Sequence, residues 1–206
     1  GTLTVSAAGQ TVDLSGGGSN DITGGVTLTG AAVTLGDSSA TVIAGITATG
    51  ALSVTSGGAI SQSGAIDADS TASFAAGANA ITLTNASNDF SGAVSLSNSG
   101  SNDVSLTDAN ALDLGTVGVG QNLAITASGA ITDSGVVTVA GTTTFDNSGG
   151  SDAAIDLGSS STYTGNVSFT TDAVSDVTIT DNRAFAIQSG LNVKNLTITQ
   201  TAELHD

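Results

Sequence analysis

The 206-residue chain contains no cysteine, proline, methionine or tryptophan, and only 3% of its residues are aromatic. Without cysteine, disulfide bonds and thiolate metal sites are excluded. The single histidine, His205, leaves no imidazole cluster for zinc and no nucleophile–base pair. These absences remove most catalytic chemistry and most transition-metal chemistry from consideration.

Positive charge is equally scarce. Arg183 and Lys194 are the only basic residues against eighteen acidic ones, which gives a formal net charge of −16. Such a chain repels phosphate backbones and anionic lipids, so we expect no nucleic acid partner and no membrane insertion. The sequence has no run of about 20 apolar residues and no leader-type segment. Because it opens directly in a strand-like pattern, we expect it to be a mature or excised piece of a longer protein.

The hydrophobic residues, 39% of the chain, are numerous enough to form a core, and their pattern is that of strands. Triplets of the form apolar–polar–apolar recur along the chain, separated by clusters of Gly, Asn, Asp and Ser that build tight turns. Examples are Val33–Leu35, Ile81–Leu83, Val104–Leu106, Val137–Val139 and Val177–Ile179. No segment keeps a helical period over three turns, so the sequence predicts an all-β fold.

A longer period lies above the short one. Leu52, Leu123 and Leu196 recur at an interval of about 70 residues, and their surroundings match. We therefore predict a single segment without a domain boundary, built from nearly three units of about 70 residues. The approximate units are 1–51, 52–122 and 123–195, with the start of another at 196–206.

Short strands at this spacing also suit a sandwich or a barrel. A solenoid is favoured, because each of its coils meets the same kind of neighbour and its sequence must therefore repeat. We predict a right-handed parallel β-helix of about nine coils, with roughly 20 to 24 residues and about three strands per coil. Its length would be roughly 40 Å, at about 4.8 Å per coil. The five Phe and Tyr163 are expected to stack in its core or at a corner.

Nearly the whole chain resembles a known style of repeat. The runs that carry the resemblance are Asn88–Leu96, Asn102–Asp108, Ala111–Gly115 and Asn122–Thr132. They are similar to repeats of large bacterial exoproteins of the filamentous haemagglutinin type. The resemblance implies a secreted or surface-exposed β-helical shaft, exported through an outer-membrane partner and used in adhesion or biofilm. It carries over no functional residues, because such shafts have no active site.

Seventeen of the eighteen acidic residues are Asp, and they recur at predicted turns. Calcium takes six to eight oxygen ligands, which Asp carboxylates and turn carbonyls of adjacent coils could supply. The candidate ligands are Asp103, Asp108, Asp176 and Asp181, with Asp108 and Asp181 first. The alternative is that these side chains cap turns and keep the rod soluble.

Three N-glycosylation sequons occur, at Asn85, Asn166 and Asn195. Enzymatic activity is not expected, although some β-helices are polysaccharide lyases or hydrolases. A lyase would need calcium-binding acids beside a basic residue, and a glycoside hydrolase needs two converging carboxylates, of which no pair can be named. We expect Arg183 and Lys194 to neutralise neighbouring acids such as Asp181 instead.

Three functional hypotheses remain open. The first is a non-catalytic shaft segment of a large bacterial surface adhesin, located extracellularly or at the cell surface. The second is a subunit that polymerises end to end into an extracellular fibre or sheath, and the third is a calcium-stabilised glycan-binding module. The expected partners are neighbouring solenoid segments of the same or identical chains, and host or cell-surface glycans or proteins bound through regions outside this sequence.

Overall fold

The computed structural model describes residues 1–16, 20–150, 153–172, 174–183, 186–188 and 191–201. These residues fold into a parallel β-solenoid of about nine coils, and no helix is among their elements. A helix able to cross a membrane is accordingly not found in this part of the chain. The expected all-β solenoid is confirmed, while its right-handedness stays a prediction.

Two long parallel sheets run the length of the rod. The path of sheet A is β1 (Leu3–Ser6), β3 (Gly25–Gly30), β5 (Thr41–Ala48), β7 (Ile60–Gln62), β10 (Ile81–Leu83), β13 (Val104–Asp108), β15 (Leu123–Ala127), β18 (Thr143–Asp146) and β20 (Val167–Thr170). The path of sheet B is β2 (Val12–Leu14), β4 (Val33–Asp37), β6 (Leu52–Ser56), β9 (Ala72–Ala75), β12 (Val94–Ser97), β14 (Leu112–Val119), β16 (Ile131–Asp133), β19 (Ile155–Tyr163), β21 (Asp176–Asp181) and β22 (Asn195–Gln200).

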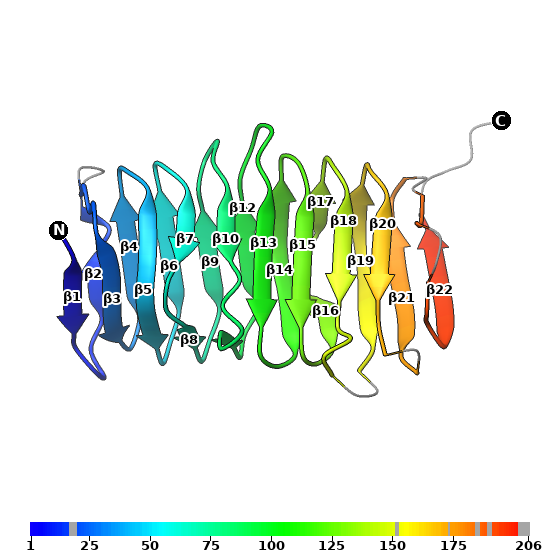
Figure 1. The fold of residues 1–206 in the computed structure, drawn as a ribbon, viewed down its shortest axis with the longest axis horizontal. Coiled ribbons are helices and arrows are strands. Elements are labelled where there is room, and N and C mark those ends of the chain that lie inside the picture. Colours follow the sequence, from blue (N-terminus) through cyan, green and yellow to red (C-terminus); the bar gives the residue numbers. More distant parts are fainter. Residues whose placement is uncertain (17–19, 151–152, 173, 184–185, 189–190, 202–206) are drawn as a thin grey trace.

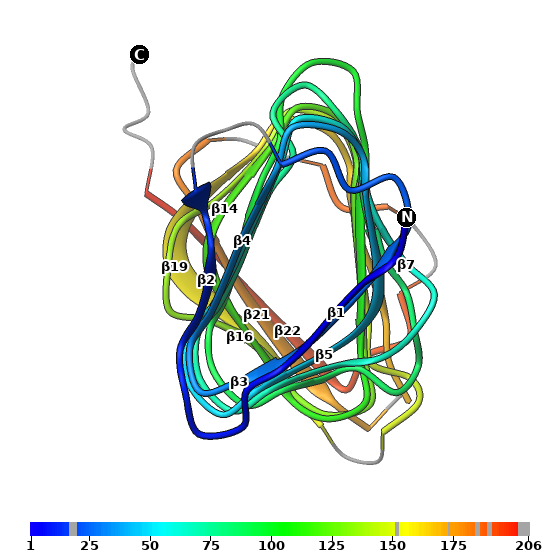
Figure 2. The same cartoon turned by 90° about the vertical axis from the view of Figure 1, so that its left-hand side faces the viewer.

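The chain alternates between the two sheets, so that strands adjacent in one sheet are one coil apart (Figure 1). Every strand pair is parallel. One coil takes 18 residues where Ser38 binds Asn20 and 24 residues where Ser168 binds Thr144. Viewed along the axis, the coils superimpose as a flattened, four-sided loop (Figure 2).

A third strand is present only in some coils, which differs from the roughly three strands expected in each. Strand β5 has a bulge, and its second half pairs with β8 (Ile66–Ala68), which pairs in turn with β11 (Asp89–Phe90). Likewise the second half of β14 pairs with β17 (Val137–Val139), which pairs with the end of β19. We call these two stacks the side branches. They exist because the long strands bend at their middle, and the next coil follows the bend with two short strands.

The sequence unit corresponds to three and a half coils. Leu52 lies in β6 of sheet B, Leu123 in β15 of sheet A and Leu196 in β22 of sheet B. Between Leu52 and Leu123 the chain crosses seven times from one sheet to the other. Because seven is odd, equivalent positions of consecutive units lie on opposite sheets. The two sheets are therefore built from the same sequence motif, advanced by about 17 Å along the axis.

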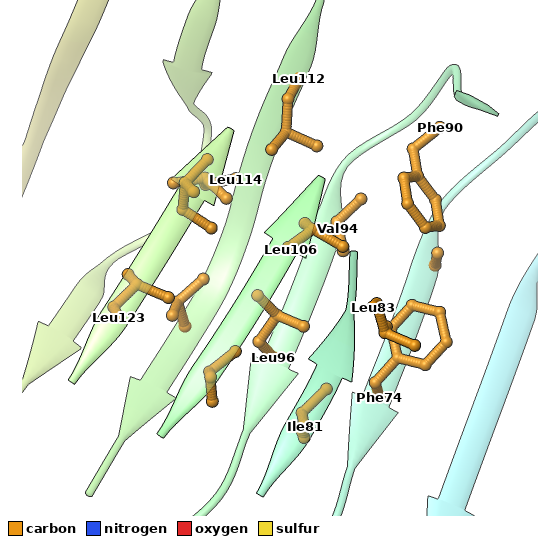
Figure 3. Packing of buried hydrophobic residues seen from close by; sticks show 14 of the residues in the cluster. Phe74, Ile81, Leu83, Phe90, Val94, Leu96, Leu106, Leu112, Leu114 and Leu123 are labelled. Carbon is orange, nitrogen blue, oxygen red and sulfur yellow. The ribbon is translucent and has the colours of Figure 1, made fainter. Parts of the chain in front are cut away.

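Inward-facing side chains form apolar ladders along the axis. Ile60, Ile81, Val104 and Leu123 pair in successive coils of sheet A, and all four are buried. Their neighbours in the strand, such as Thr82 and Ser105, face outward. Figure 3 shows Ile81, Leu96, Leu106 and Leu123 pointing into the common interior. The alternation expected from the sequence is thus confirmed, and it stabilises every coil through both of its neighbours.

The aromatic residues in the described ranges stack in the core, as expected. Phe74 and Phe90 meet edge to face at 6.1 Å between ring centroids, with an interplanar angle of 83° (Figure 3). Phe145 and Tyr163, which occupy the equivalent positions one unit later, meet at 6.2 Å and 86°. The same aromatic contact is therefore built twice. Phe185 lies outside the described residues.

Glycine is required where the chain bends between β7 and β8. A Cβ atom on Gly64 would overlap the carbonyl oxygen of Ala44 in the preceding coil. Gly135, one unit later, approaches the main chain of Gly115 in the same way. The close approach recurs because both bends must follow the bulge of the strand below.

Replacing Gly64 with alanine is therefore expected to lower the free energy of unfolding by about 2 kcal/mol or more, because two main-chain segments must separate. Gly118 is the matched control, since a Cβ there meets nothing within 4 Å. Gly118→Ala should leave stability unchanged or raise it slightly. Urea denaturation of both variants measures the difference, and equal stabilities would refute the assigned close approach.

Candidate functional site: the corner aspartates

The structure does not bring the four predicted calcium ligands together. Asp103 precedes β13 and Asp108 ends it, whereas Asp176 begins β21 and Asp181 ends it. Strand β13 belongs to sheet A and β21 to sheet B. In the described ranges, no group of three or more His, Cys, Asp or Glu side chains could hold a metal ion. Calcium binding stays a prediction without support from this placement.

Asp108 and Asp181 instead share a structural position with Asp37. Each of the three is the last residue of a strand, and each occupies the same place in its sequence unit. All three are buried. We call Asp37, Asp108 and Asp181 the corner aspartates. Asp37 was not among the residues predicted from sequence, although its position in the repeat would have identified it.

Each corner aspartate accepts a hydrogen bond from the main chain of the preceding coil. The donors are the N–H groups of Ile22 to Asp37 (3.3 Å), Phe90 to Asp108 (3.2 Å) and Tyr163 to Asp181 (3.1 Å). Phe90 ends β11 and Tyr163 ends β19, which are the last strands of the two side branches. An ionised carboxylate is an acceptor only, so it can replace the carbonyl of the strand that would come next. Asp108 and Asp181 thus terminate the side branches.

The remaining hydrogen bonds of these carboxylates differ. Asp37 also accepts from the N–H and hydroxyl of Ser39 and, through its other oxygen, from Thr41. Asp181 accepts from the main-chain N–H of Arg183 at 2.7 Å. The expected contact between Arg183 and Asp181 thus includes the backbone of Arg183. In Asp108, by contrast, Oδ2 is buried without a hydrogen-bond partner.

This difference perturbs the titration of Asp108. Burial, with a smaller contribution from the nearby Asp89 carboxylate, raises the pKa of Asp108 from 3.8 to about 6. The N–H groups of Phe90, Asn110 and Ala109 act in the opposite direction without cancelling the burial. Because the folded-state pKa lies above the unfolded value, the folded protein holds this proton more tightly. Its stabilising effect is complete below pH 4 and is lost as the pH rises through 6.

We therefore expect Asp108→Asn to raise the free energy of unfolding at pH 7 by about 2 kcal/mol, because the buried charge is removed. The gain should vanish near pH 4, where Asp108 is already protonated. Asp181→Asn is the matched control: both of its oxygens accept N–H donors, so an amide NH₂ would face a donor and lower stability. Thermal denaturation between pH 4 and 7 measures both effects. A pH-independent gain for Asp108→Asn would contradict the assignment.

A second buried polar group holds the bend of the first side branch. The Nε2 group of Gln62 donates to Oδ1 of Asn88 at 2.8 Å, and Nδ2 of Asn88 donates to Oε1 of Gln62 at 3.0 Å. Asn88 also donates to the carbonyls of Leu83 and Thr107 and accepts from the N–H of Ile66. We call this reciprocal pair the amide clasp. It joins three successive coils where β8 and β11 diverge from sheet A.

The second side branch uses different residues at these positions. Asp133 stands where the first has Gln62, and Ser161 stands where it has Asn88. The hydroxyl of Ser161 accepts from the N–H of Val137, as Asn88 does from Ile66. Asp133 accepts from the N–H of Ser159, while burial raises its pKa. Neither bend is evident in the sequence, because Asn and Asp there resemble ordinary turn residues.

The other predicted site residues lie on the surface. Oδ1 of Asp103 accepts from the N–H of Asn122 in the next coil, and Oδ1 of Asp176 accepts from the side-chain amide of Asn195. Among the sequon residues, Asn166 and Asn195 are exposed, whereas Asn85 is half-buried and forms a turn with the N–H of Ser87. Glycosylation stays a prediction at all three.

The hollows in the described surface are shallow, and one lies at an end. An opening of about 380 Å³ at the first coil is lined by Leu3, Leu14, Asn20, Asp21 and Ile22. A second, of about 250 Å³, is lined by Ser15, Thr34, Leu35, Gly36, Asp37 and Thr55. Neither lining includes an aromatic ring on which a sugar could stack.

The fold and the corner aspartates together define a parallel β-solenoid repeat protein. Comparison with protein families gives a match to the family described as repeats of unknown function (DUF5649), twice, over residues 30–97 and 101–170. These matches cover more than half of the chain, which therefore belongs to this family. The second match begins about one sequence unit after the first, although the boundaries predicted for the units stay untested. No curated protein and no solved structure matches the chain.

Proposed function

We propose that the chain is a structural, non-catalytic shaft segment of a large bacterial surface exoprotein of the adhesin type. The observation that carries the proposal is the unbroken coil-to-coil packing. Each apolar ladder passes through successive coils, and the sheets continue from β1 to β20 and from β2 to β22. Such a rod transmits position and load along its axis, which is what a shaft must do.

Two further features support this role. The repeats resemble those of exoproteins of the filamentous haemagglutinin type, which act as surface-exposed shafts. The absence of cysteine and methionine suits an oxidising exterior, and the net charge of −16 keeps a β-rich chain soluble. An extracellular or cell-surface location follows from the same proposal.

Antibody labelling of the producing bacteria tests the location. Antibodies raised against this chain should label intact cells as strongly as permeabilised cells. Labelling that requires permeabilisation would refute a surface location, and an antibody against a cytoplasmic protein is the control for cell integrity.

The shaft role is tested separately from the location by ligand binding. The isolated chain should bind no glycan on an array, and 1 mM Ca²⁺ should leave its thermal midpoint within about 1 °C of the value in a chelator. Calcium-dependent glycan binding would replace the shaft proposal with a calcium-stabilised glycan-binding module.

A further inference from the structure

The last described coil leaves part of its core uncovered. Strand β22 pairs with β21 on one side, and its other edge has no strand partner among the described residues. Ile198, which continues the ladder position of Ile179, is 46% exposed. Leu196 is only partly buried, as are Leu191 and Val193. This end therefore presents apolar side chains beside free backbone hydrogen-bonding groups (Figure 1).

The first coil presents a matching face at the opposite end of the rod (Figure 1). Strands β1 and β2 each pair with a single neighbour among the described strands. Leu3, Leu14 and Ile22 are partly buried and line the opening of about 380 Å³. In the interior of the rod, positions of this kind are covered by the preceding coil. Both end faces thus have the shape and chemistry of the coil-to-coil interface that the chain forms within itself.

The charges at the two ends are of opposite sign. Arg183 and Lys194, the only basic residues of the chain, both lie in its last coil and are exposed. Asp13 and Asp21 are exposed in the first coil. Arg183 follows the corner aspartate at the end of β21, and Asp21 precedes Ile22, whose N–H binds the corner aspartate at the end of β4. Both strands belong to sheet B, so Arg183 and Asp21 occupy the same corner of the coil.

We propose that the C-terminal coil of one copy of this chain docks on the N-terminal coil of a second copy, head to tail. Strand β2 of the second copy pairs in parallel with β22, which places Val12 and Leu14 over Leu196 and Ile198. Strand β1 continues sheet A beyond Ile187, which bridges to Val167. Arg183 lies near Asp21 of the docked copy and sets the rotation about the axis. The contact is heterologous and leaves both outer ends free, so it extends into filaments.

The inference goes beyond the shaft role and does not depend on it. A segment joined to its neighbours only through the polypeptide would stay monomeric in solution, whereas docking predicts reversible, concentration-dependent assembly. Failure of the docking would leave the proposed surface location and shaft role untouched, because antibody labelling and ligand binding test those.

Sedimentation velocity of the full 206-residue chain at neutral pH and low salt, with electron microscopy of the same samples, provides the test. Unbranched filaments are expected, with association increasing with protein concentration. Ile198→Asp should weaken association at least tenfold, since it puts a charge in the docking face. Val136→Asp is the matched control, because Val136 is 47% exposed but lies between β16 and β17, away from both ends. Equal effects of the two variants, or a monomer at every concentration, would overturn the proposal.

Charge reversal tests the orientation independently of the apolar contact. Arg183→Glu should weaken association about threefold to tenfold at low salt, and the effect should shrink at about 1 M salt. Combining Arg183→Glu with Asp21→Lys in one chain restores opposite charges across the contact and should recover most of the loss. Circular dichroism confirms that each variant folds. A double variant that assembles no better than Arg183→Glu alone would refute head-to-tail docking at this corner.

Discussion

Phe145→Ala is expected to lower the free energy of unfolding by about 4 kcal/mol, the usual cost of removing a fully buried ring. Phe145 is buried completely and contacts two rings in neighbouring coils. It meets Tyr163 edge to face and stacks on Phe169 at 5.8 Å between centroids, with an interplanar angle of 16°. A cavity here cannot collapse easily, because the strands on either side are fixed by their ladder hydrogen bonds. Chemical denaturation followed by circular dichroism measures the loss.

Phe74→Ala provides the comparison. Phe74 occupies the same position one unit earlier and makes the same edge-to-face contact, with Phe90. No third ring stacks on it among the described residues. Phe145→Ala should therefore cost more than Phe74→Ala by about 1 kcal/mol, the value of one aromatic pair. Equal losses would show that the Phe169 stack contributes nothing to stability.

Asn88→Ala should have an effect of similar size, about 3 to 4 kcal/mol, through lost hydrogen bonds rather than lost packing. Removing the amide leaves the N–H of Ile66 and the carbonyls of Leu83 and Thr107 buried without their partner. The side chain of Gln62 also loses both bonds of the amide clasp. Because these groups belong to three coils, the loss should be seen as one cooperative change in denaturation.

Asn102→Ala is the control, since Asn102 makes a turn bond to the carbonyl of Ser99 at the surface. Its loss should stay below about 1 kcal/mol. A double-mutant cycle between Gln62 and Asn88 then isolates the clasp, with an expected coupling of about 1 to 3 kcal/mol. A coupling near zero would mean that each amide acts through its backbone partners alone.

Much of the fold could be predicted from sequence because the repeat constrains it. Alternation such as Val104, Ser105, Leu106 fixes which face of a strand is buried, and the long internal period disfavours a sandwich. The half-integral number of coils per unit could not be predicted, because coil length varies from 18 residues at Asn20 to 24 residues at Thr144. The length of the unit is equally compatible with three coils, three and a half, or four.

The chemistry of the candidate site could be predicted only in part. The sequence identified Asp108 and Asp181 as equivalent positions, which the structure confirms. It could not show that they are buried, because a strand-terminal Asp and an exposed turn Asp have the same local sequence. The donors to these carboxylates, such as Phe90 and Tyr163, lie 18 residues earlier in the chain. Contacts of this kind depend on the coil length, and hence on the fold.

The odd number of sheet crossings per unit has a consequence for how such proteins evolve. A gain or loss of one unit changes the length of a rod by about 17 Å and also turns everything beyond it by half a revolution. Whatever the distal part displays then faces the opposite direction relative to the base. Only a pair of units, such as the stretch from Leu52 to Leu196, restores the original azimuth. Parity of unit number is thus a heritable property of the rod, and we expect insertions of two units to be tolerated where insertions of one are not.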